Sequence, residues 1–141
     1  MNYTEYYNKD NLLTIFDSLV AQALPEKIIG SWKVKEIEYI YADTAISVSQ
    51  SDYGRFIFTD HTYTVGYNPY MNTRVAFKDL SKPDDNELKR TFQTIVFNSG
   101  EYTVENKTIH TISDIAKVPG FEGGHQFYSV EFDKGTLLLT M

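Results

Sequence analysis

The chain has 141 residues, enough for one domain with a hydrophobic core, and it carries a net charge of −6. Thirteen basic against nineteen acidic residues form no basic patch, so we expect no nucleic-acid partner. Because the chain has no cysteine, disulfides, a thiol nucleophile and a cysteine-ligated metal are excluded. Three isolated histidines without paired spacing predict no metal site, and no motif indicates another cofactor.

The N-terminal region predicts a helical extension, over residues 1–27, to a barrel that spans residues 28–141. Residues 1–9 are polar and tyrosine-rich, and we expect them to be loose. Apolar residues then recur three and four apart, which predicts a helix over about residues 11–24 that ends at Pro25. We expect this helix to pack on the barrel wall or across its bottom; the alternative is a lid over an open end.

Neither a secretory signal nor a membrane span is evident. The N-terminus lacks a positively charged start, and no stretch approaches the roughly 20 apolar residues that a spanning helix needs. We therefore expect a cytoplasmic protein.

Residues 30–41 predict a long bent strand. Apolar and charged residues alternate along it, and the apolar parity switches midway, which is typical of a strand bent by a bulge. Residues 45–49 form a possible short strand by their alternation, and residues 53–59 and 62–67 predict a hairpin with Asp60 and His61 at its turn. His61 is expected to be exposed.

The segment after this hairpin is irregular until Pro83-Asp84-Asp85, where a second helical pattern begins. Leu88 and Phe92 lie on its apolar face, and Gly100 would be its C-terminal stop. A strand over residues 91–97 is the alternative, because Thr94-Ile95-Val96 favours β-structure.

The last section predicts four strands: residues 101–104, 108–112, 125–132 and 136–140, with turns at residues 105–107 and 133–135. On residues 125–132, one face carries His125 and Glu131. We expect the other face, with Tyr128, Val130 and Phe132, to point inward, because it buries more apolar surface. Together these elements predict a mainly β protein, an antiparallel up-and-down barrel of about eight strands with an N-terminal helix and one further short helix.

Five segments in order resemble the bacterial lipocalin-like domain family. They are Ile29-Gly30-Ser31-Trp32-Lys33-Val34, Gly54-Arg55-Phe56-Ile57-Phe58-Thr59, Ser99-Gly100-Glu101-Tyr102-Thr103-Val104, the Thr108-x-His110 step and Gly135-Thr136-Leu137-Leu138-Leu139. The resemblance covers about residues 28–141 and implies a calycin-type barrel with an internal cavity.

The resemblance also implies that Trp32 plugs the closed end of the barrel. In lipocalins this tryptophan often stacks on an arginine from the last strands, but residues 126–129 contain none. The family pattern usually runs one strand further than Met141. The barrel is therefore either incomplete, or the N-terminal segment or another subunit covers the gap.

Tyrosines and one histidine are the candidate ligand-binding residues. His110 lies mid-strand between Ile109 and Ile112, where an inward imidazole could hydrogen-bond a ligand or act as a general base; a core or surface histidine is the alternative. Tyrosine hydroxyls could orient a ligand or simply pack. The candidate set is Tyr39, Tyr63, Tyr67, Tyr102 and His110.

Three functional hypotheses follow. The first is binding of a small, largely apolar molecule in the barrel cavity, which suits an aromatic content of 15%. The second is a cofactor-free isomerase or cyclase for a polyketide-like or isoprenoid-like molecule, with His110 as its acid or base. The third is an interaction module with a filled barrel that forms a homodimer through an unclosed edge.

Overall fold

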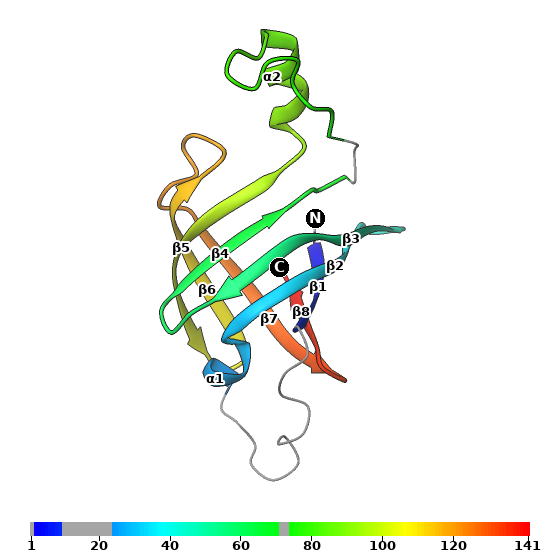
Figure 1. Ribbon diagram of the computed structural model, residues 1–141. Helices are drawn as coiled ribbons and strands as arrows, with labels where there is room; N and C mark the ends of the chain where they lie inside the picture. Colours follow the sequence, from blue (N-terminus) through cyan, green and yellow to red (C-terminus); the bar gives the residue numbers. More distant parts are fainter. Residues whose placement is uncertain (1, 10–23, 71–73) are drawn as a thin grey trace.

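A computed structural model describes residues 2–9, 24–70 and 74–141 and shows a closed antiparallel barrel (Figure 1). Each strand pairs with the next along the chain, and the last pairs with the first. The mainly β fold class and the number of strands are therefore confirmed. The elements are β1 (Asn2–Lys9), α1 (Leu24–Ile28), β2 (Gly30–Ile40), β3 (Ala45–Phe58), β4 (Thr62–Tyr67), α2 (Asp85–Phe92), β5 (Val96–Glu105), β6 (Thr108–Ala116), β7 (His125–Asp133) and β8 (Thr136–Thr140).

Strand β1 closes the barrel. Thr4 pairs with Glu38 of β2 on one side and with Thr140 of β8 on the other. The prediction that residues 1–9 are loose is therefore wrong for residues 2–9, and the barrel strands begin well before residue 28. The N-terminal segment fills the gap left after β8, so no strand beyond Met141 is needed for closure.

Strand β2 bends where the alternation predicted it. The register with β3 shifts between Val34 and Glu36, and the buried positions change from Trp32 and Val34 to Ile37 and Tyr39. The bulge therefore reverses which alternate residues of β2 face inward, so the apolar side chains on both sides of it point into the barrel. Strand β3 is continuous over residues 45–58, so the predicted short strand and first hairpin strand are one element.

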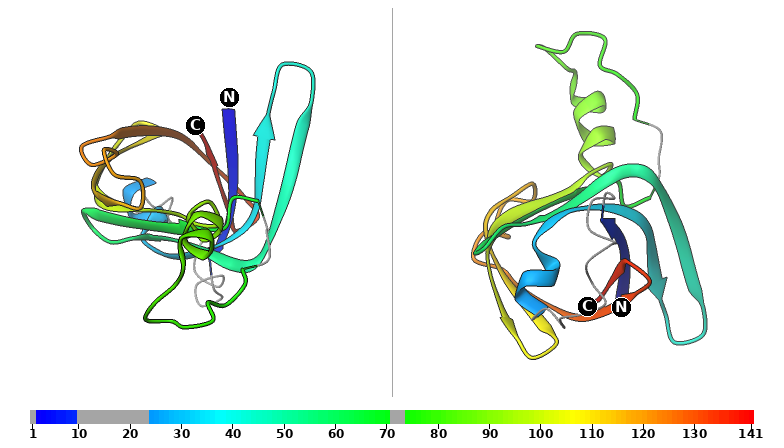
Figure 2. Two further views of the ribbon diagram at one scale, coloured as in Figure 1. Left: turned by 90° about the horizontal axis from the view of Figure 1, so that it is seen from above. Right: turned by 60° about the horizontal axis from the view of Figure 1, so that its bottom comes forward.

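Helix α2 begins as its sequence predicted but ends earlier. The Asp84 side chain accepts hydrogen bonds from the backbone N–H groups of Asn86 and Glu87, and Glu87 accepts one from the N–H of Asp84, which completes a capping box. The helix ends at Phe92, and β5 starts at Val96, so both the helical and the strand interpretation hold in part. Figures 1 and 2 show α2 projecting from the end of the barrel opposite α1.

Gly100 lies inside β5 rather than at a helix end. It sits where the register between β5 and β6 shifts, and a Cβ atom there would lie 2.0 Å from the carbonyl oxygen of Ile112. The two backbones therefore approach more closely than any side chain allows. The predicted role of Gly100 as a helix stop is wrong.

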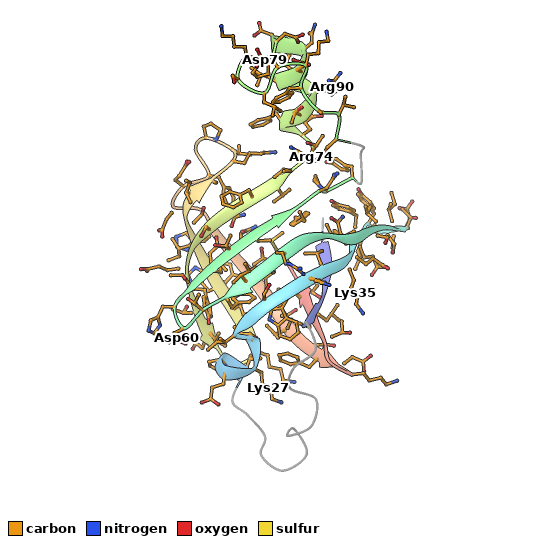
Figure 3. The ribbon with its side chains drawn as sticks, viewed as in Figure 1. Lys27, Lys35, Asp60, Arg74, Asp79 and Arg90 are labelled. Atoms are coloured by element: carbon orange, nitrogen blue, oxygen red, sulfur yellow. The ribbon has the colours of Figure 1, made fainter. Side chains whose placement is uncertain are left out.

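Trp32 and α1 lie at one end of the barrel. The Trp32 indole N–H donates to the carbonyl oxygen of Ile28 at 2.7 Å, and its ring centroid lies 6.2 Å from that of Phe132. Lys27 Nζ lies 5.8 Å from the same Phe132 ring (Figure 3 labels Lys27 beside α1). These contacts support the implied closed end, where the Phe132 ring lies within reach of both Lys27 and the Trp32 ring.

Pro25 lies within α1 and does not end a helix there, because proline is tolerated in a first turn. Residues 11–23 of the predicted N-terminal helix are outside the described residues. Neither helix in the described part of the chain has the length and apolar content that crossing a membrane requires.

An aromatic cluster fills the barrel above Trp32. Phe56 stacks on Phe58 with ring centroids 4.5 Å apart, and Tyr128 meets Phe56 edge-on at 5.9 Å. Tyr102 meets Phe58 edge-on at 5.1 Å. Aromatic pairs of this geometry add about 0.5–1.5 kcal/mol each beyond burial, so this half of the barrel is a packed core.

Gly100→Ala should lower the free energy of unfolding by about 2 kcal/mol or more, because the β5 and β6 backbones must separate to admit the methyl group. Gly66→Ala on β4 is the matched control, since its Cβ would meet no atom closer than 3.7 Å. Urea denaturation of both variants measures the difference. Equal stability of the two would contradict the close approach at Gly100.

Candidate functional site

The inner wall of the barrel carries both apolar and polar side chains. The fully buried side chains of β2, β4 and β8 are aliphatic or aromatic, whereas β5 and β6 also bury polar side chains. Three polar residues of β5 and β6 are almost completely buried: Asn98, Thr111 and Ser113, with exposed fractions of 4%, 0% and 2%. Buried polar groups cost free energy unless they are paired, so we ask what each of them contacts.

Tyr63 of β4 and Asn98 of β5, on neighbouring strands, form a hydrogen bond inside the barrel. The Tyr63 hydroxyl donates to Asn98 Oδ1 at 2.6 Å, and both side chains are buried. Burial raises the pKa of Tyr63, while the nearby hydroxyl side chains of Thr111 and Ser113 oppose this rise. Tyr63 is thus a neutral phenol whose hydrogen is already committed to the chain.

Thr111 and Gln126 differ from the hydrogen-bonded pair of Tyr63 and Asn98. They pair directly across β6 and β7, so their side chains share the inner face. Thr111 Oγ1 and Gln126 Oε1 are both buried, and neither makes a hydrogen bond of standard geometry among the described residues, although the Thr111 hydroxyl lies close enough to the Tyr63 hydroxyl to lower the pKa of Tyr63. The other polar atom of Gln126, Nε2, contacts only a weak acceptor, Met141 Sδ, at 3.6 Å. Two neighbouring polar atoms therefore face the interior with unused hydrogen-bonding capacity.

The end of the barrel opposite Trp32 carries a third such atom. Gln50 is fully buried; its Nε2 donates to the carbonyl oxygen of Asn68 at 2.7 Å, while Oε1 lacks a partner among the described residues. The Tyr39 hydroxyl donates to the carbonyl oxygen of Pro69 at 2.8 Å, and its ring lies 6.4 Å from that of Tyr70. The chain after β4 is thus fastened to the inner side of β2 and β3.

The predicted tyrosines point inward, as the parity of their strands indicated. Tyr39, Tyr63 and Tyr102 are buried, and Tyr67 packs against the core. However, the hydroxyls of Tyr39, Tyr63 and Tyr102 bond the protein itself: Tyr102 donates to the carbonyl oxygen of Thr59 at 2.6 Å, in addition to the bonds of Tyr39 and Tyr63 given above. These three are committed to packing and internal hydrogen bonds.

His110 lies on the outer face of the barrel, so it is the surface histidine of the two alternatives and does not line the interior. Its neighbours Ile109 and Thr111 are completely buried, which places His110 on the opposite side of β6. Its ring stacks on Phe127 at 4.4 Å, and its Nε2 lies 2.7 Å from His125 Nδ1 at an exposed position. His61 is exposed at the β3–β4 turn, as expected, next to Asp60, which Figure 3 labels.

The face chosen for residues 125–132 is largely right. Tyr128 and Val130 are buried and Glu131 is exposed, as expected. Phe132 is 39% exposed because it lies at the closed end beside Trp32. The described residues contain no group of three or more side chains that could hold a metal ion.

No pattern in the sequence singled out the interior polar residues, which are Gln50, Asn98, Thr111, Ser113 and Gln126. The face of β6 was ambiguous because Ile109 and Ile112 have opposite parity. One signal was available: Tyr128 was correctly placed inward, and its pairing with Ile109 would have turned Thr111 inward too. That inference needed the register of the β6–β7 pair, which the long intervening loop leaves open.

Alkaline pH should destabilise the fold through Tyr63. Its folded-state pKa is raised, so the unfolded chain ionises first, near a pH of about 10, and stability falls as the pH rises above that value. The free energy of unfolding, measured by urea denaturation from about pH 8 to 11, should decline less steeply in Tyr63→Phe. Tyr102 has a pKa raised by burial and by Asp60, so Tyr102→Phe should behave similarly. Unchanged slopes in both variants would contradict this account.

Comparisons with known proteins identify a family for this chain and two similar solved structures. A family model described as a lipocalin-like domain matches residues 29–141. A solved lipocalin-like protein from Bacteroides uniformis is similar in structure, with 16% identity, a TM-score of 0.40 and coverage of 81% of this chain and 96% of that chain. An uncharacterized protein from Bacteroides eggerthii shows 11% identity, a TM-score of 0.42 and coverage of 80% and 97%. A search of curated protein sequences gave no match. Because the family model spans most of the sequence, the chain belongs to the lipocalin-like domain family.

Proposed function

We propose that the barrel binds a small molecule with a largely apolar body and a polar group that hydrogen-bonds Thr111 and Gln126. The family supports the general idea, since barrels of about eight strands hold either their own side chains or one small ligand. The neighbouring pair of unpartnered buried atoms, Thr111 Oγ1 and Gln126 Oε1, is the observation that carries it.

The energetic argument starts from the cost of these atoms. A buried polar group without a partner costs about 1–3 kcal/mol, and neighbouring Tyr63 and Asn98 show that this interior can satisfy such groups internally. A ligand that donates to Gln126 Oε1 and shares a hydrogen bond with the Thr111 hydroxyl would recover that cost on binding. A hydroxyl, or an amide N–H beside a carbonyl, has the required chemistry.

The apolar part of the ligand would lie against buried apolar residues of other strands. Ile37 of β2, Val65 of β4 and Leu139 of β8 are buried and face inward. The aromatic cluster of Phe56, Phe58 and Tyr102 fills the Trp32 end, and Thr111 pairs with Tyr102 across β5 and β6, so the ligand would extend from the edge of this cluster toward Gln50. A few polar groups placed among apolar ones would fix the ligand's orientation.

The isomerase alternative has lost its main support. It assigned the acid or base to His110, and His110 lies outside the barrel. Among the described side chains of the barrel interior there is no histidine or carboxylate to replace it. Binding is therefore the function that we propose.

Native mass spectrometry of the purified protein should show an adduct that is released on denaturation and identified by extraction. Thr111→Val should abolish or strongly reduce it, because the isosteric change removes the polar contact and keeps the shape. Thr64→Val on β4 is the matched control, since the Thr64 hydroxyl already bonds Ser99 at 2.8 Å. An adduct retained by Thr111→Val would contradict the assigned site.

The same two variants should differ in stability without ligand. Thr111→Val removes an unpartnered buried hydroxyl and should raise the free energy of unfolding by about 1 kcal/mol. Thr64→Val breaks an existing hydrogen bond and should lower it by about 1 kcal/mol. Chemical denaturation of the ligand-free protein measures the free energy of unfolding of both variants. A lower free energy of unfolding for Thr111→Val would show that the Thr111 hydroxyl stabilises the fold and would contradict this prediction.

A further inference from the structure

Strand β3 has a long stretch with a neighbour on only one side. Its fourteen residues pair with β2 over most of their length, but β4 pairs only with Arg55–Phe58. Among the described residues, no backbone partner lies on the other side of Ala45–Gln50, which we call the free edge. Figures 1 and 2 show this part of the β2–β3 hairpin extending beyond the barrel.

The free edge lacks the features that usually block association. Lysine, proline and inward-pointing charges protect most edge strands in soluble proteins. The segment Ala45-Ile46-Ser47-Val48-Ser49-Gln50 contains no charge and no proline. Ala45, Ile46, Ser47 and Ser49 are exposed, and Ile46 retains 52% of its side-chain accessibility. The register between β2 and β3 shifts beside this segment, between Val34 and Glu36 of β2.

The sequence of the free edge is complementary to itself in an antiparallel arrangement. Around a twofold axis at Val48, Ser47 of one copy faces Ser49 of the other, and Ile46 faces Gln50. The nearest acidic residues, Asp43 and Asp52, would face Tyr53 and Thr44 in this register, so no like charges oppose each other. A twofold interface needs this kind of self-complementary surface.

We propose that the free edge of β3 pairs antiparallel with the same edge of a second copy of this chain, centred on Val48. The two β2–β3 hairpins then form one continuous four-stranded ribbon between two barrels. Backbone hydrogen bonds supply the attraction, and the Ser47–Ser49 contacts set the register. The contact is small, so the dimer forms in a concentration-dependent way.

Sedimentation velocity of the full chain over a range of concentrations is the first test. We expect a dimer that dissociates on dilution. The double substitution of Ser47→Lys and Ser49→Lys should abolish this dimer at every concentration, because lysines would face each other across the axis. Both lysines would lie beside Glu38 and Glu36 of β2, which favours normal folding. Ile57→Lys is the matched control, since Ile57 is exposed on the same strand but is flanked by β2 and β4.

A cross-linking experiment tests the register, because the chain has no cysteine of its own. A mixture of Ser47→Cys and Ser49→Cys proteins should form a disulfide-linked heterodimer faster than either variant alone links to itself. A wild-type protein that stays monomeric up to about 1 mM would overturn the proposal. A dimer that survives the double lysine substitution, or that cross-links no faster in the mixture, would overturn it as well.

Discussion

The fold depends on backbone hydrogen bonding between β1 and its two neighbours, β2 and β8. An open sheet would leave the edges of β2 and β8 without partners, and unpaired strand edges are both costly and prone to association. The pairing of Thr4 with Glu38 and Thr140 removes both edges at once. Once the sheet is closed, alternate residues of every strand are directed inward, and the composition of the interior follows from that alternation.

Closure divides the interior into two halves with different chemistry. Toward α1, Trp32 and the rings of Phe56, Phe58 and Tyr102 pack in well-defined aromatic pairs, and the tyrosine hydroxyl is bonded to the backbone. The other end buries the Gln50 amide and the Tyr39 hydroxyl, and both donate to backbone carbonyl oxygens of the chain after β4. The barrel thus has an aromatic core at one end, while Thr111, Gln126 and Gln50 carry buried polar atoms without a hydrogen bond among the described residues. In the binding function that we propose, a ligand would satisfy these atoms without disturbing the aromatic core.

Elements were predicted correctly from the sequence where the residue pattern within a single element was sufficient. The parity switch around Lys35 located the bulge of β2, and the acidic residues at Asp84 and Glu87 located the start of α2. Prediction failed where the deciding partner is far away along the chain. Residues 2–9 have no apolar alternation, and their pairing with β2 on one side and with β8, beyond residue 135, on the other makes them a strand. The inner face of β6 depends on its register with β7, so Thr111 was missed and His110 was preferred.

The position of Trp32 determines what an optical experiment can detect. It is the chain's single tryptophan, it is 3% exposed, and its indole N–H is bonded to Ile28 at the closed end. It pairs across the sheet with Phe56 of the aromatic cluster. Its emission should therefore follow the docking of α1 and remain nearly constant when a molecule enters from the far end. A fluorescence titration without a signal would be expected even for a tight complex, so screening needs a calorimetric or mass-based readout.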